Sequence, residues 1–130
     1  MRRLAPALAL CACMLAGSCG GGEQPARGRS LTAAADKGLR VVAREYSFDP
    51  ATVVVTGGGG TLDVTLDNRG SLAHDLRIVK GTKELGGTPS FSGGRARTAS
   101  VRLAPGSYRF LCTVGDHAQL GMRGRLEIRR

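Results

Sequence analysis

The sequence has few of the residues that build metal clusters or large aromatic cores. It contains only two histidines, no tryptophan, and 4% aromatic residues. Two imidazoles exclude any catalytic mechanism or metal cluster that needs three or more histidines. The 20 glycines and five prolines favour instead a turn-rich chain of β structure. The 130 residues suffice for one compact domain with short accessory segments, which excludes a multidomain enzyme.

The beginning of the chain has the pattern of an export signal. Two arginines follow the initial methionine, and the apolar run from Leu4 to Ala16 is too short to anchor the chain across a bilayer. Small residues then lead to Cys19. We therefore interpret residues 1–18 as a lipoprotein-type signal peptide, after which Cys19 carries the lipid and becomes the mature N-terminus. The alternatives are cleavage at Cys13 and an ordinary signal peptide with an incidental cysteine.

The segment after the signal is predicted to be a tether. Residues 19–38 begin with the lipidated cysteine and are rich in Gly, Ala, Arg and Ser, which is typical of a flexible linker. The chain is thus expected to be exported, periplasmic or at the cell surface, and lipid-anchored to a membrane. Cleavage before Cys19 leaves Cys112 as the one free thiol, so no intramolecular disulfide is expected.

Residues 39–130 are predicted to form one all-β domain. Leu62, Val64 and Leu66 alternate with polar residues in the period of a half-buried strand. The stretch from Lys80 to about Gly94 has no clear periodicity and is interpreted as a loop, whereas Gly106 and Gly124 are interpreted as turn residues. About seven to eight short strands without an amphipathic helix predict a two-sheet antiparallel sandwich.

Four residues of this domain have side chains that bind soft metals. Cys112, His117 and Met122 follow one another at intervals of five residues, and His74 lies upstream in a predicted strand. They are every Cys, His and Met of the mature chain apart from the lipidated cysteine. A thiolate, two imidazoles and a thioether suit copper that cycles between two oxidation states, whereas zinc has no use for a thioether. Taken singly, each has an ordinary structural alternative: a hydrogen-bonded histidine, a buried thiol, or a methionine packed in the core.

The motifs around these residues resemble a known family. A Cys-x4-His-x4-Met loop follows a Tyr-x-Phe-x-Cys strand, and the upstream histidine follows Asn-x-Gly. By these motifs, residues 39–130 resemble a small blue (type 1) copper protein of the cupredoxin family, of the plastocyanin and azurin type. The resemblance implies a Greek-key β-sandwich with one copper ion at one end. The ligands that it implies are His74, Cys112 and His117 in the equatorial positions and Met122 in the axial position.

Two positions depart from the pattern of that family. Family loops commonly carry Pro-Gly before the histidine, whereas this chain has Gly115 and Asp116. A carboxylate beside a ligand should stabilise oxidised copper and lower the reduction potential, less so if it is well solvated. Asp75 stands where Asn is frequent, and we expect it to accept a hydrogen bond from Thr113 and to link the two ligand segments.

The predicted function is transfer of single electrons between redox partners outside the cytoplasm. Four protein ligands leave little room for a substrate, so an enzyme is not expected, and the His117 edge is the expected exit for the electron. Multicopper oxidases and copper nitrite reductases need further imidazoles, and a binuclear copper centre needs two bridging cysteines. The alternative is a periplasmic copper-binding or delivery protein; a weaker one is a metal-free sandwich for adhesion or assembly.

The charge balance suggests a class of partner. With 19 Lys and Arg against 10 Asp and Glu, the formal net charge is +9. A basic surface attracts acidic redox partners or anionic lipid headgroups, although an arginine-rich composition also arises from codon usage. Nucleic acid is not expected as a partner of an exported chain with few aromatics, and a monomer is expected.

Overall fold

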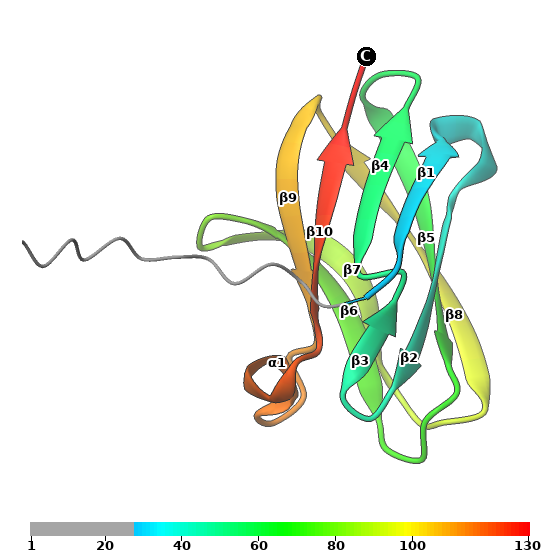
Figure 1. The fold of residues 1–130 in the computed structure, drawn as a ribbon, viewed down its shortest axis with the longest axis vertical. Helices are drawn as coiled ribbons and strands as arrows, with labels where there is room; N and C mark the ends of the chain where they lie inside the picture. Colours follow the sequence, from blue (N-terminus) through cyan, green and yellow to red (C-terminus); the bar gives the residue numbers. More distant parts are fainter. Residues whose placement is uncertain (1–27) are drawn as a thin grey trace, which may run out of the picture.

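The computed structural model describes residues 28–130, which form two β-sheets packed face to face (Figure 1). The predicted signal peptide and Cys19 lie outside the described residues. No helix within residues 28–130 has the length and apolarity to cross a membrane. The sandwich predicted from the strand pattern is therefore confirmed for the part of the chain that the structure describes.

The larger sheet has six strands and the smaller sheet has four. In spatial order the larger sheet contains β1 (Ser30–Ala34), β4 (Thr52–Thr56), β10 (Arg123–Ile128), β9 (Gly106–Leu111), β6 (His74–Lys80) and β7 (Lys83–Phe91). The smaller sheet contains β3 (Ser47–Asp49), β2 (Leu39–Arg44), β5 (Gly60–Asn68) and β8 (Arg95–Leu103). A 3₁₀ turn, η1 (Ala35–Lys37), and a four-residue helix, α1 (His117–Leu120), complete the described elements.

The sheets are mixed rather than purely antiparallel, and the described strands number ten rather than seven or eight. Strand β4 pairs in parallel with both β1 and β10, and β2 pairs in parallel with β5. Parallel neighbours arise because the chain repeatedly crosses between the sheets. After β1 it enters the smaller sheet for β2 and β3 and then returns at β4, so strands of equal direction become neighbours.

Two segments that the sequence analysis assigns to irregular chain are strands. Strand β1 lies within the predicted linker of residues 19–38 and pairs along its whole length with β4, so the folded domain begins before residue 39. It is largely exposed, which explains the missing apolar alternation. Strand β7 lies within the predicted loop after Lys80. Gly86 and Gly87 interrupt its pattern, and a Cβ at Gly87 would overlap the carbonyl of Leu76 on β6.

The core lies between the two sheets. On β5, Leu62, Val64 and Leu66 are buried as the alternation predicts, and they face apolar residues of the larger sheet. Phe110 on β9 is completely buried, and Tyr108 on the same strand donates a hydrogen bond from its hydroxyl to the carbonyl of Ala104 at 2.7 Å.

Strand register brings the predicted ligands to one end of the sandwich. Strand β9 pairs antiparallel with both β6 and β10, and Leu111 lies opposite Arg77 on one side and Arg123 on the other. The start of β6, the end of β9 and the start of β10 therefore lie at the same end of the larger sheet. The hydrogen-bonded backbone of these strands places His74, Cys112 and Met122 there.

Candidate metal centre

Three side chains converge at this end of the sandwich. His74 Nδ1 lies 3.2 Å from His117 Nδ1 and 4.0 Å from Cys112 Sγ, and His117 Nδ1 lies 3.6 Å from Cys112 Sγ. All three residues are buried, with exposures of 0%, 1% and 7% for His74, Cys112 and His117. They form the one such group of potential metal ligands among residues 28–130. The convergence joins residues 38 positions apart in the chain.

The loop between Cys112 and β10 returns on itself through backbone hydrogen bonds. The N–H of His117 donates to the carbonyl of Val114 at 3.1 Å, and the N–H of Met122 donates to the carbonyl of His117 at 3.0 Å. The N–H of Cys112 donates in turn to the carbonyl of Met122 at 3.0 Å. The two ends of the loop are thus joined, and Met122, completely buried, lies beside the cysteine.

Gly121 allows this return. Its φ of 131° lies in a region that side-chain-bearing residues rarely adopt, and a Cβ there would stand 3.0 Å from the carbonyl oxygen of Tyr46. The turn after α1 therefore packs directly against the turn between β2 and β3.

The spacing of the three donor atoms fits a shared ion. Ligands spread evenly around one ion, with bonds of about 2.0–2.3 Å, lie about 3.5–3.8 Å from one another. The observed separations of 3.2, 3.6 and 4.0 Å scatter around that range. Burial raises the pKa of the Cys112 thiol, so binding of a metal by the thiolate releases a proton.

A carboxylate that the sequence analysis does not identify contacts the site from outside. Glu45, in the turn after β2, has its Oε1 atom 3.2 Å from His74 Nε2. The same oxygen accepts hydrogen bonds from the backbone N–H groups of Ser71 at 2.7 Å and Leu72 at 2.8 Å. The bond from Leu72 is the main cause that lowers the pKa of Glu45 to about 2. No local motif marks this residue, because it precedes His74 by 29 positions.

The expected link between the two ligand segments is present. Asp75 accepts one hydrogen bond from the backbone N–H of Thr113 and a second from its hydroxyl. Asp116, by contrast, is exposed, and its carboxylate makes no capping hydrogen bond at the start of α1. Solvent therefore screens its charge, which weakens the effect on a reduction potential that the sequence analysis assigns to it.

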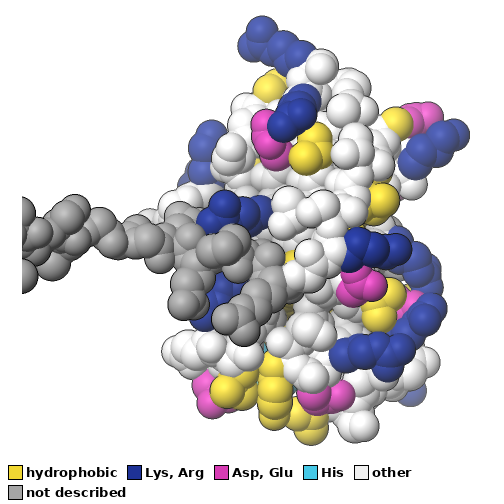
Figure 2. Space-filling view, in the orientation of Figure 1, with side chains coloured by type: hydrophobic (Ala, Val, Ile, Leu, Met, Phe, Trp, Pro, Cys, Tyr) yellow, Lys and Arg dark blue, Asp and Glu magenta, His cyan; other side chains and the backbone are white. Residues whose placement is uncertain are grey.

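Exposed apolar side chains lie near the residues of the candidate metal centre. The Tyr46 ring lies 5.0 Å from the His117 ring in an edge-on arrangement, and it is 37% exposed. Leu120 follows on α1 and Leu72 adjoins the Glu45 contact; both are exposed. We call these three residues, Tyr46, Leu72 and Leu120, the apolar rim. Figure 2 shows hydrophobic side chains gathered at the lower end of the molecule, with acidic side chains on either side.

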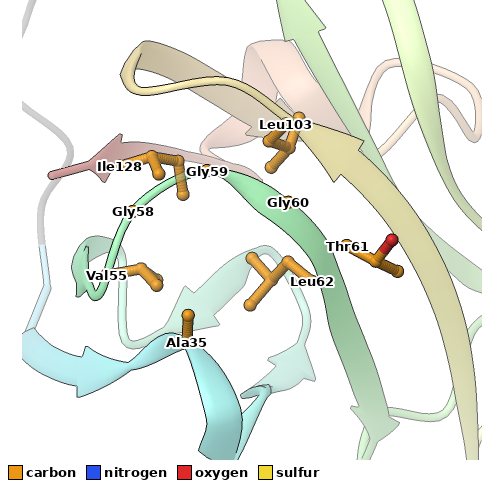
Figure 3. A pocket seen from close by; sticks show the side chains of 9 residues that line it. All are labelled: Ala35, Val55, Gly58, Gly59, Gly60, Thr61, Leu62, Leu103 and Ile128. Carbon is orange, nitrogen blue, oxygen red and sulfur yellow. The ribbon is translucent and has the colours of Figure 1, made fainter. Parts of the chain in front are cut away.

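The opposite end of the sandwich contains a small cavity without metal-binding side chains. A cavity of about 40 Å³ is lined there by Val55, Leu62, Leu103 and Ile128, together with glycines (Figure 3). None of its lining residues has a titratable or metal-binding side chain. This cavity is therefore not a candidate for a second metal site.

Comparison with known proteins identifies structures with a similar fold. No protein-family model matches the sequence, and no curated protein matches it. Solved structures do match. Reduced auracyanin from Roseiflexus castenholzii is 22% identical over 77% of this chain and 98% of its own, with a TM-score of 0.63. An azurin from Methylomonas sp. strain J is 14% identical over 78% and 98%, with a TM-score of 0.61.

Rusticyanin from Thiobacillus ferrooxidans is 21% identical over 76% of this chain and 81% of its own, with a TM-score of 0.56. A purple cupredoxin from Nitrosopumilus maritimus also matches, with a TM-score of 0.51. These proteins share the arrangement of strands with this chain, and the sequence motifs independently resemble the same family. The chain described here therefore has the cupredoxin fold, with a buried His-Cys-His group at one end of the sandwich.

Proposed function

We propose that this protein holds one type 1 copper ion and carries single electrons between redox partners. The observation that carries the proposal is the convergence of His74 Nδ1, His117 Nδ1 and Cys112 Sγ within 4.0 Å of one another in a buried site. These three residues are the proposed equatorial ligands, and the buried Met122 is the proposed axial ligand. A copper ion bound there supplies a one-electron change between Cu(I) and Cu(II).

The donor set supports copper over zinc. Structural zinc sites take four cysteine, histidine or carboxylate ligands in a closed tetrahedron. Here the two histidines and one thiol have no fourth ligand of that kind within the group, and the nearby sulfur is a thioether. Two of the matching structures are of an auracyanin and a rusticyanin in the reduced state.

The site suits electron transfer better than catalysis. Its ligand residues are at least nine-tenths buried, and a hydrogen bond joins the two ends of the loop that carries Cys112, His117 and Met122. Such buried ligands leave little room for a substrate at the metal, and a rigid set of ligands needs little rearrangement when the metal changes oxidation state. His117, under the apolar rim, is the proposed exit for the electron, and the rim is the proposed surface for brief docking.

The sequence supports a location and a partner class for this carrier. We propose that the chain is exported, anchored to a membrane through a lipid on Cys19, and monomeric. Lys and Arg side chains are spread over much of the face in Figure 2, which supports salt-dependent association with an acidic redox partner.

Addition of Cu(II) to the purified protein tests the proposal. An intense visible band from thiolate-to-copper charge transfer is expected, and C112S is expected to abolish it. The matched control is C19S, which removes the other mature cysteine and leaves the band. A colourless wild-type protein, or a blue C112S protein, would overturn the copper assignment.

Reduction then separates a carrier from a delivery protein. A carrier retains its copper through repeated cycles of reduction and oxidation, because the ligands are fixed before the metal arrives. Prompt loss of copper on reduction, measured by metal analysis after gel filtration, would favour copper delivery instead.

A further inference from the structure

Hydrogen bonds hold the carboxylate of Glu45 beside the candidate metal centre. Its Oε1 atom receives the backbone N–H groups of Ser71 and Leu72 and faces His74 Nε2 at 3.2 Å. A Cβ at Gly70 would overlap the carboxylate, so a side chain at this position would displace Glu45 from this contact. These contacts join the turn after β2, in the smaller sheet, to the loop that leads into His74 on β6, in the larger sheet.

The Glu45 carboxylate determines which ring nitrogen of His74 carries the proton. An ionised carboxylate only accepts hydrogen bonds, so Nε2 of His74 must be the donor. A neutral imidazole has one N–H, and the other nitrogen, Nδ1, then presents a bare lone pair. That nitrogen is the one that lies 3.2 Å from His117 and 4.0 Å from Cys112 Sγ. Glu45 therefore leaves the metal-facing atom of His74 ready to bind.

We propose that Glu45 is a positioning residue of this centre, which fixes the tautomer of His74 and favours the oxidised metal through its negative charge. The second part rests on the proposed copper function. Carboxylates that accept the second N–H of a metal-bound histidine orient its ring and raise its basicity, and their loss typically weakens metal binding about 10–100-fold. The Glu45 side chain is 31% exposed, so solvent screens part of its charge.

The first test uses the metal-free protein. Long-range ¹⁵N–¹H spectra identify the protonated ring nitrogen of His74 in the wild type, E45Q and E45A. We expect Nε2–H in the wild type and in E45Q, whose amide oxygen still accepts, and a mixture of tautomers in E45A. An unchanged His74 tautomer in E45A would overturn the positioning role. This arm needs no copper, so it decides that role even if the protein binds none.

The second test measures the copper-loaded protein. E45Q removes the charge but keeps an acceptor oxygen, so the reduction potential is expected to rise. E45A is expected to bind Cu(II) about 10–100-fold more weakly in competition with a chelator. The matched control is E127Q. Glu127 is an exposed carboxylate on β10 that pairs with Arg129 near the opposite end of the sandwich. The potential and affinity of E127Q should equal those of the wild type.

The outcomes keep the two proposals apart. If the wild-type protein shows no blue band, the copper function is rejected. If the wild-type protein is blue but E45Q has the same reduction potential, only the charge effect of Glu45 is rejected. Backbone spectra check that the variants keep the fold. If E45A fails to fold, the potential of E45Q still decides the role of the charge.

Discussion

Asp75 accepts two hydrogen bonds from Thr113, one from the backbone N–H at 2.6 Å and one from the hydroxyl at 2.5 Å. Each residue directly follows a proposed ligand, His74 on β6 and Cys112 after β9. The pair therefore links the segment that carries His74 to the segment that carries Cys112.

Removal of the Asp75 carboxylate should cost more stability than removal of the Thr113 hydroxyl. D75A removes the charged acceptor of the part-buried backbone N–H of Thr113 as well as the hydroxyl bond, so we expect the free energy of unfolding to fall by about 2–3 kcal/mol. T113A removes only the hydroxyl bond and should cost about 1 kcal/mol. Urea unfolding of the metal-free variants measures both. Because the residues share one contact, D75A/T113A should lose less than the sum of the single changes. Strict additivity would show that the link does not act as one unit.

The Asp75 contact could be predicted from the sequence, whereas the Glu45 contact could not. Asp75 and Thr113 adjoin two motif residues, so bringing those residues together also brings their neighbours together. Glu45 reaches His74 through a turn of the other sheet, and only the packing of the two sheets creates that contact.

Strands were predictable where one face is buried and the alternation is strong, as in β5. They were missed where that signal is absent. Strand β1 is held mainly by backbone pairing with β4 while its side chains are largely exposed. In strand β7, Gly87 lies where the backbone of Leu76 approaches closely, and Gly86 packs against the Val101 side chain. A hydrophobic pattern detects apolar burial, whereas β1 has no buried residue and β7 buries only Thr88 and Phe91.

Substitution of the proposed axial ligand should change the potential but not the colour. Met122 is completely buried, and leucine has a similar volume, so M122L should cost less than about 1.5 kcal/mol of stability. The thiolate band arises from Cys112, so it should persist. Loss of the thioether should raise the reduction potential, measured by cyclic voltammetry. A potential equal to that of the wild type would exclude Met122 as a ligand.

A charge on the apolar rim should slow electron transfer without altering the site. Leu120 is 52% exposed, so L120E should change the free energy of unfolding by no more than about 0.5 kcal/mol. We expect slower electron self-exchange between two copies, measured by NMR line broadening, because two negative rims repel each other. The matched control is L31E on β1, where another exposed leucine lies away from the ligands. Equal slowing in both variants would contradict docking through the rim.

The metal-free fold should lose stability in acid partly through Asp67. Burial alone would raise the pKa of this carboxyl, but hydrogen bonds from Arg40 and Arg69, both at 2.9 Å, outweigh burial and leave the pKa below its usual value. A lowered folded-state pKa gives stability that is present above the unfolded value of about 3.9 and is lost as the pH falls through the folded value. Urea unfolding between pH 6 and pH 2 should therefore show a shallower loss in D67N than in the wild type. Parallel curves for the two proteins would exclude this contribution.

Gly124 is a packing residue rather than the turn residue that the sequence analysis expects. It lies inside β10 opposite Phe110, and a Cβ would overlap both the Phe110 ring and the carbonyl of Ala51. Since Phe110 is completely buried, its ring has no free space to enter, and G124A should destabilise the protein by about 1–3 kcal/mol. F110L shortens the side chain that meets the new methyl group, so F110L/G124A should lose less stability than the two single changes together. Urea unfolding of the four proteins tests this coupling. If the losses simply add, the overlap with Phe110 is not what excludes a side chain at position 124, and the contact with the Ala51 carbonyl must be responsible.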